Sequence, residues 1–275
     1  MNKKFYIFIF IVVSVLIILS IKLFNIKDKT SLLFSSYHGF IIEEDTIVGY
    51  EGGGGNIVIP KMVNGVVVKR IGKHVFENMG IKSVVIPNNI IEIEEYAFAN
   101  NEIISLNIPS SVEVLGEGSF IHNNISNIKI ESNTIIGNAC FNDNSLDYEN
   151  AFFYKVINGE IDYSEIVSYG GKIRGNVAIP KTKENIELLT IGEKSFYDTG
   201  IIAVSIPNTV KNINSEAFSK NFLVEIYLSN NIENIAIDAF NENSYLSEVV
   251  IDNYDNSILN YPWGADKSNF HWLKK

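Results

Sequence analysis

Few residues of this 275-residue chain belong to the types that most often carry catalysis or bind metals. The chain has four histidines, His38, His74, His122 and His271, and a single cysteine, Cys140. A zinc site needs three or four converging ligands, but no histidine here belongs to an H-E-x-x-H motif or has a second ligand at metal-binding spacing. We therefore expect histidines at the surface or in the caps, and no metal site.

Two other stretches have part of a ligand-binding pattern. Gly52 to Gly55 form a glycine run, but no Gly-Lys-Ser or Gly-Lys-Thr follows and the next residues predict a strand, so a turn is favoured over a phosphate loop. Asp252, Asp255 and Asn256 suggest a calcium loop, but the twelfth position counted from Asp252 is Trp263 rather than glutamate. No local signature indicates a catalytic triad or a carboxylate pair, so we predict no enzyme activity and no cofactor.

Much of the chain consists of repeats of one motif. The motif is roughly Val/Ile-x-Ile/Val-Pro-x-x-Val/Ile-x-x-Ile-x-x-x-small-Phe, and it occurs in eight stretches. Equivalent residues of the two halves, such as Pro60 and Pro180, are 120 positions apart, so a module of four coils occurs twice. A short fixed period predicts coils stacked in a line, which is a solenoid. The phenylalanines recur every 21 or 22 residues within each module, at Phe76, Phe98, Phe120 and Phe141 and at Phe196, Phe218 and Phe240.

Each coil has a predicted strand and a predicted turn. Residues Val84 to Pro87 alternate between two faces, and proline ends the strand because it has no N–H group to donate. The spacing of Ile90, Ile93 and Phe98 then predicts a brief helical turn that places Phe98 inside the coil. Cys140 holds the position before a phenylalanine where other coils have valine, alanine or serine, so we predict a buried filler rather than a reactive thiol.

Each module also opens with alternating β-branched and aromatic residues. The first opening runs from Tyr37 to Ile42 and leads to the glycine run, and the second runs from Phe152 to Val156 and ends at Gly171. Both predict a small hairpin that covers the first coil. At the other end, Trp263 is predicted to close the last coil rather than to form an exposed aromatic anchor.

The motif, as it stands in residues 84–98, 106–120, 204–218 and 226–240, resembles the BspA-like bacterial leucine-rich repeat family. The similarity extends over about residues 37–266. It implies a leucine-rich-repeat solenoid with about eight short parallel strands and brief helical or 3-10 turns, display on a bacterial surface, a role in adhesion or protein binding, and no shared catalytic residues. The chain departs from the family at Glu131 and Asp252, which stand where proline is expected, and it has no visible cell-wall sorting motif.

Residues 5–24 are almost entirely apolar and follow a short basic head. Twenty helical residues span about 30 Å, the thickness of a hydrocarbon core, and the run is longer than the apolar region of a signal peptide. We predict a cytoplasmic tail (1–4), a transmembrane signal anchor (5–24), a linker (25–36), module 1 (37–148) and module 2 (149–275). The repeat domain would be extracellular on a single-pass protein of the cell membrane, and secretion after cleavage is the alternative.

The predicted binding surface consists of the strand residues that point away from the core. If the first and third residues of each strand point inward, the middle residues of successive coils form a line along one sheet face. The net charge of −10 and the lack of a basic stripe exclude nucleic acid as a partner, whereas the mixed side chains suit a protein or a glycan. An envelope spacer without a ligand and a surface hydrolase are the alternatives. The predicted partner-binding residues are Val85, Asn107, Lys129, Ser205, Tyr227 and Val250.

Overall fold

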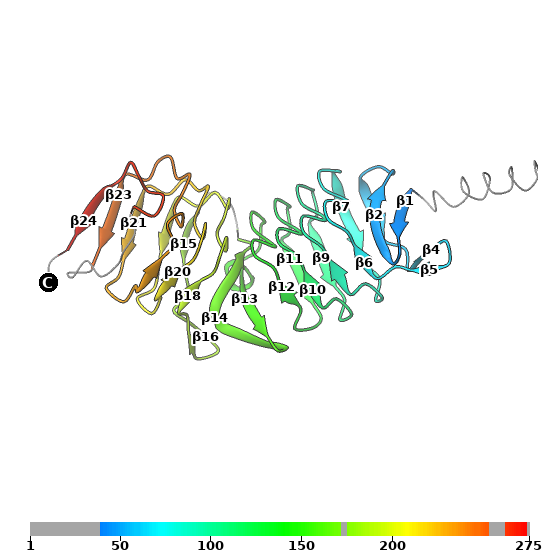
Figure 1. Cartoon of the computed structure of the whole chain (residues 1–275), viewed down its shortest axis with the longest axis horizontal. Coiled ribbons are helices and arrows are strands. Elements are labelled where there is room, and N and C mark those ends of the chain that lie inside the picture. The colour runs from blue at the N-terminus through cyan, green and yellow to red at the C-terminus, as the bar shows by residue number, and fades with distance from the viewer. Residues whose placement is uncertain (1–38, 172–174, 253–261, 274–275) are drawn as a thin grey trace, which may run out of the picture.

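The chain forms a rod of stacked coils (Figure 1). The structure is a computed structural model, and it describes residues 39–171, 175–252 and 262–273. A full coil adds one strand to each of two sides of the rod. The membrane span predicted at residues 5–24 lies outside the described residues, and within them no helix is long and apolar enough to cross a membrane.

One side of the rod carries two sheets that each begin with an antiparallel hairpin and continue with short parallel strands. We call them the hairpin sheets. The first has the order β1 (Phe40–Glu43), β2 (Thr46–Tyr50), β6 (Arg70–Ile71), β8 (Glu92–Ile93), β10 (Val114–Leu115) and β12 (Ile135–Ile136). The second has the order β13 (Phe152–Ile157), β14 (Glu160–Tyr169), β18 (Thr190–Ile191), β20 (Asn212–Ile213) and β22 (Asn234–Ile235).

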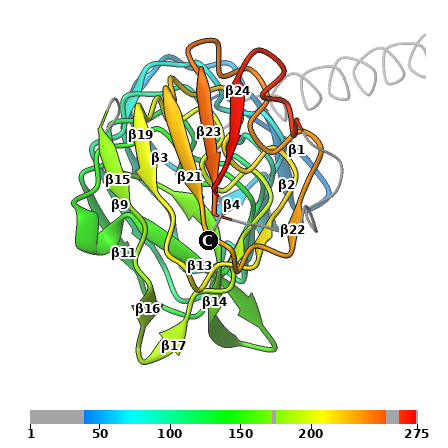
Figure 2. The same ribbon diagram turned by 90° about the vertical axis from the view of Figure 1, so that its left-hand side faces the viewer.

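The other side carries strands from the Val/Ile-x-Ile part of the motif, which we call the ladder strands. They pair in parallel as β3 (Gly55–Val58) with β7 (Ile81–Val85), β9 (Ser105–Ile108) with β11 (Asn127–Ile130), β15 (Asn176–Ala178) with β19 (Ala203–Ser205), and β21 (Glu225–Leu228) with β23 (Glu248–Ile251) and β24 (Asn269–Trp272). Figure 2 shows the ladder strands of the second module side by side. Two small hairpins, β4 (Met62–Val63) with β5 (Val66–Val67) and β16 (Thr182–Lys183) with β17 (Ile186–Glu187), and one 3-10 turn, η1 (Tyr148–Asn150), complete the described elements.

The helical turn predicted for each coil is wrong. Ile93 lies in strand β8, and the backbone groups that follow it bond to the neighbouring coils: Glu94 N–H donates to Ile71 O at 2.9 Å, and Phe98 N–H donates to Ser119 O at 2.8 Å. Tyr96 between them has a φ of 55°, which a right-handed helix cannot contain. Because stacking satisfies the backbone across coils, a segment with helical spacing forms a strand and tight turns instead.

The predicted phenylalanine core is confirmed. Phe98 and Phe120 are fully buried and stack at 5.2 Å between ring centroids with 6° between their planes, and Phe218 and Phe240 stack at 5.4 Å and 5°. Cys140 is also fully buried, and burial raises the pKa of its thiol to about 12. It is therefore a protonated filler at physiological pH, as predicted.

A column of asparagines, four buried and one half-buried, runs beside the phenylalanines. The Nδ2 of Asn123 donates to Phe98 O of the preceding coil at 2.9 Å and to Phe120 O of its own coil at 3.1 Å, while its Oδ1 accepts from Ile103 N–H at 3.1 Å. One amide thus pairs backbone groups that the turns of two coils leave without partners. The same arrangement recurs at Asn101, Asn144, Asn221 and Asn243.

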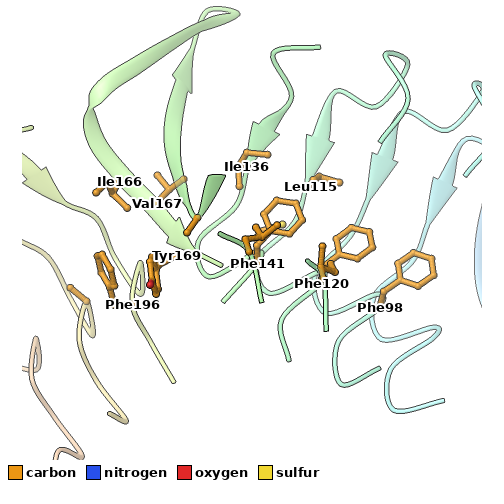
Figure 3. Packing of buried hydrophobic residues seen from close by; sticks show 14 of the residues in the cluster. Phe98, Leu115, Phe120, Ile136, Phe141, Ile166, Val167, Tyr169 and Phe196 are labelled. Carbon is orange, nitrogen blue, oxygen red and sulfur yellow. The ribbon is translucent and has the colours of Figure 1, made fainter. Parts of the chain in front are cut away.

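The two modules form one continuous rod (Figure 1), and Figure 3 shows buried side chains of both modules near their junction. The predicted opening hairpins are present as β1–β2 and β13–β14, and the second lies between the modules. Its Phe153 stacks on Phe141 of module 1 at 4.4 Å, and its Tyr169 stacks on Phe196 of module 2 at 5.1 Å. The aromatic core therefore passes through this hairpin instead of ending at the module boundary.

The last coil is closed as predicted. Trp263 is fully buried, and its carbonyl accepts a hydrogen bond from Phe240 N–H at 2.9 Å. Trp272 lies on β24 and packs against the edge of the core.

Candidate binding surface

The predicted binding residues all lie on ladder strands, and their side chains point away from the core. Along β9, Ser105 and Asn107 are exposed while Leu106 and Ile108 are buried, which is the alternation expected of a sheet with one covered face. Val85, Asn107, Lys129, Ser205 and Tyr227 are exposed, and Val250 is half-buried. We call this set of outward positions the ladder face.

Parallel pairing sets these residues side by side in register. Val85 lies beside Val58, and the two valines are 56% and 65% exposed. Tyr227, 48% exposed, lies beside Val250. Further pairs are Asn107 with Lys129 and Ser205 with Ala178.

The ladder face is not one uninterrupted line, which corrects the prediction. The ladder strands belong to several small sheets, since β7 does not pair with β9, β11 with β15 or β19 with β21. After the fourth coil of module 1, η1 stands where a further ladder strand would continue the line. Tyr148 of η1 is 53% exposed, and its hydroxyl donates to Ala178 O of module 2 at 2.8 Å. The face therefore has two parts, one on each module, with a tyrosine between them.

The two parts differ in charge. On module 1, Val58 and Val85 are followed by Asn107 and by Lys129, whose ammonium lies 2.9 Å from Glu131 and lowers the pKa of that carboxyl. On module 2, Tyr227 and Val250 are bordered by acidic side chains. Glu248 accepts hydrogen bonds from Asn269 and His271, which lower its pKa, and the pKa of Tyr227 is raised by desolvation and by Asp252. Module 1 thus presents an apolar and polar surface, and module 2 an acidic surface with one aromatic ring.

The described histidines are held by carboxylates and do not converge on a site. His74 Nδ1 lies 2.6 Å from Glu77 and His271 pairs with Glu248. His122 lies between Asp143 and Asp198, and these carboxylates raise its pKa to about 9. They contact opposite ring nitrogens, so they cannot bind one metal ion together with the imidazole. Within the described ranges, no group of three His, Cys, Asp or Glu side chains is placed to hold a metal.

The other motif residues have structural roles or lie outside the described residues. The glycine run is a turn that leads into β3, as predicted, and a side chain at Gly54 would lie 2.0 Å from Met79 O. His38, Asp255 and Asn256 are outside the described residues.

A family model for the BspA type leucine rich repeat region matches six copies over residues 56–158 and 175–264. The chain belongs to the BspA-type leucine-rich repeat family. The model matches the repeats of both modules, and the parallel stacked coils are the arrangement that such repeats form.

Three solved structures of bacterial proteins are similar to this BspA-type chain. A leucine-rich repeat protein from Eubacterium ventriosum is 16% identical with a TM-score of 0.53, and the match covers 79% of this chain and 66% of that one. A leucine rich cell surface protein from Faecalibacterium prausnitzii is 23% identical with a TM-score of 0.40, covering 79% and 55% of the two chains. The pneumococcal vaccine antigen PcpA is 18% identical with a TM-score of 0.38, covering 77% and 78%.

At these identities the likeness concerns the fold alone. The chain spans 66% and 55% of the lengths of the first two of these proteins. No curated protein matches the sequence.

Tyr148 is the residue of this BspA-type surface that the sequence did not predict. It lies just after the fourth coil of module 1, where the motif stops at Asp147-Tyr148-Glu149-Asn150, so the break in the repeat was the available signal. The asparagine column had a clearer signal, since Asn101, Asn123, Asn144, Asn221 and Asn243 all stand three residues after a repeated phenylalanine.

Proposed function

We propose that this chain is a membrane-anchored protein of the bacterial cell surface that binds a protein or a glycan, without catalysis, through the ladder face. The observation that supports this most strongly is the pair Val58 and Val85. Two apolar side chains that are more than half exposed lie side by side on paired strands, and neither belongs to the hydrophobic core. Apolar side chains at the centre of a patch, surrounded by polar neighbours, are typical of a recognition surface.

Membrane anchoring in this proposal depends on the apolar segment 5–24, and extracellular display depends on the short tail before it. The proposal includes no catalysis, since each described histidine is paired with a carboxylate. Assays with glycan, peptide and ester substrate panels test this part, and turnover that follows the purified protein would contradict it.

The binding role is tested by presenting the full chain in nanodiscs to arrays of glycans and of extracellular proteins. The test variant carries Val85→Asp and Tyr227→Asp, and the matched control carries Ile135→Asp. Ile135 is 48% exposed on β12, so this control places one of the two added charges on a similarly exposed strand residue of the opposite side. We expect specific binding that the ladder variant loses and the control keeps.

Folding of each variant is checked by circular dichroism. Binding that a folded ladder variant retains would refute the ladder face as the contact surface. If no array component binds and cells with the ladder variant behave as wild type, the chain is a structural spacer instead.

A further inference from the structure

The small hairpin after the first ladder strand occurs in both modules but differs in chemistry. In module 1, Met62 of β4 lies opposite Val67 of β5, and these side chains are 49% and 41% exposed. In module 2, 120 positions later, Thr182 of β16 lies opposite Glu187 of β17, and both are exposed. The same element thus presents an uncharged apolar pair in one module and a polar, acidic pair in the other.

The apolar pair of module 1 is not needed to fold the hairpin. Val63 supplies the inward contact, since it is 1% exposed and belongs to the core. Val68 N–H donates to Lys61 O at 3.1 Å, and the equivalent bond from Leu188 N–H to Lys181 O, at 2.9 Å, closes the hairpin of module 2. Because module 2 builds the same hairpin with threonine and glutamate, the exposed Met62 and Val67 of module 1 call for another explanation.

The position of the apolar hairpin indicates what covers it. It belongs to the first full coil, where Lys69 N–H donates to Asp45 O of the opening hairpin at 2.7 Å, and Figure 1 shows β4 and β5 at the same end of the rod as β1. Residues 25–38 are all that separate the predicted membrane span from Gly39. A chain of this length reaches at most about 50 Å, so it keeps this end of the rod near the bilayer. The hairpin of module 2 lies four coils further along.

We propose that the β4–β5 hairpin contacts the membrane surface beside the anchor. Met62, Val66 and Val67 enter the boundary between headgroups and acyl chains, and the exposed Lys61 lies among anionic headgroups. The free energy falls when apolar side chains leave water at this boundary, and a neighbouring lysine adds electrostatic attraction to anionic headgroups. The proposal rests on the membrane anchoring that is part of the proposed function.

Single-cysteine probes test this contact. Cys140 is fully buried, so a cysteine introduced at the surface is labelled selectively by a polarity-sensitive fluorophore. The test position is Val66→Cys and the matched control is Ile186→Cys, because these residues are 39% and 43% exposed at equivalent places in the two hairpins. The full chain is reconstituted in vesicles of phosphatidylglycerol and phosphatidylethanolamine that contain spin-labelled lipids as quenchers.

We expect a blue shift and lipid quenching of the probe at position 66 but not at position 186. Adding Met62→Thr and Val67→Glu, the residues of module 2, should remove both signals. Equal quenching at the two positions, no quenching at position 66, or a blue shift there without quenching, which would indicate a protein contact, overturns the proposal. Vesicle flotation separates the hairpin contact from membrane anchoring. A chain that floats but is not quenched at position 66 is anchored without the hairpin contact. A chain that neither floats nor is quenched contradicts both the anchoring and the contact.

Discussion

At the scale of single residues, Asn123 shows how a coil that buries its backbone keeps its hydrogen bonds. Its side chain pairs the carbonyls of Phe98 and Phe120 and the N–H group of Ile103, all of them inside the rod. A buried polar group that loses its partner costs far more than an exposed one. The asparagine column therefore contributes to stacking alongside the phenylalanine column.

Replacing Asn123 by alanine should lower the free energy of unfolding by about 1–3 kcal/mol, because the buried N–H of Ile103 loses its partner and the carbonyls of Phe98 and Phe120 keep only one side-chain donor each, Asn101 and Asn144. The neighbouring Asn124 is exposed, and its replacement by alanine should change the free energy of unfolding by less than about 0.5 kcal/mol. Chemical denaturation of both variants measures the difference. Similar values for the two would show that the column does not carry stability.

Replacing Phe98 by alanine should cost about 3–5 kcal/mol, since the ring is fully buried and the cavity is bounded by the rings of Phe76 and Phe120 at 4.9 and 5.2 Å. Replacement by leucine should cost less, because it retains most of the buried volume. Thermal and chemical unfolding of the two variants test this ranking. A loss below about 1 kcal/mol for alanine would contradict the stacked core.

At the scale of elements, the opening hairpin β13–β14 joins two modules that would otherwise meet with exposed ends. It supplies an aromatic ring to each side, Phe153 to Phe141 and Tyr169 to Phe196. Ser168 Oγ accepts from Phe141 N–H at 2.9 Å and donates to Asn142 Oδ1 at 2.9 Å. The hairpin is thus part of the core at its base and projects from the rod at its tip (Figures 1 and 2).

Replacing Phe153 by alanine should destabilise the rod by about 2–4 kcal/mol, because the ring connects the aromatic columns of the two modules. Tyr163 of the same hairpin contacts the ring of Tyr154, at 5.1 Å between centroids, and its replacement by alanine should have a smaller effect. Urea denaturation is the measurement. Equal, small effects would indicate that the hairpin only bulges from the solenoid.

Much of this architecture could be predicted from the sequence, because the spacing of Phe98 and its equivalents reports a period directly. The outward direction of Asn107 and Tyr227 followed from alternation along a strand. The strand at Ile93 could not be predicted, since its spacing fits a helix and only the neighbouring coils provide its hydrogen-bond partners. The break in the ladder face at Tyr148 was also missed, because the loss of a motif does not specify what replaces it.

At the scale of the whole molecule, side chains from coils far apart in sequence fix the two modules to each other. The Nζ of Lys194 in module 2 lies 2.8 Å from Oε1 of Glu117 in module 1, and both side chains are partly buried. Asp198 of module 2 lies 3.4 Å from His122, whose other ring nitrogen lies 2.7 Å from Asp143. The rod is therefore held together at the junction by charge as well as by the aromatic core.

The pKa of His122 is raised to about 9 by Asp143 and then by Asp198, so the folded state binds its proton more tightly than the unfolded state does. The resulting stabilisation is complete below the unfolded pKa of about 6.5 and is lost as the pH rises towards about 9. We expect the difference in unfolding free energy between wild type and His122→Gln to shrink over this range. Denaturation at several pH values measures it, and a difference that stays constant would contradict the assignment.

The ladder face is tested most directly by a footprint of the bound partner. Side-chain oxidation by hydroxyl radicals is compared with and without the partner captured on the arrays, followed by mass spectrometry of each modified residue. The account predicts protection of Val85 and Tyr227 on the ladder strands, with Ile135 of β12 unchanged. Protection of Ile135 and its neighbours on the hairpin sheets, with Val85 and Tyr227 as reactive as in the free protein, would contradict it.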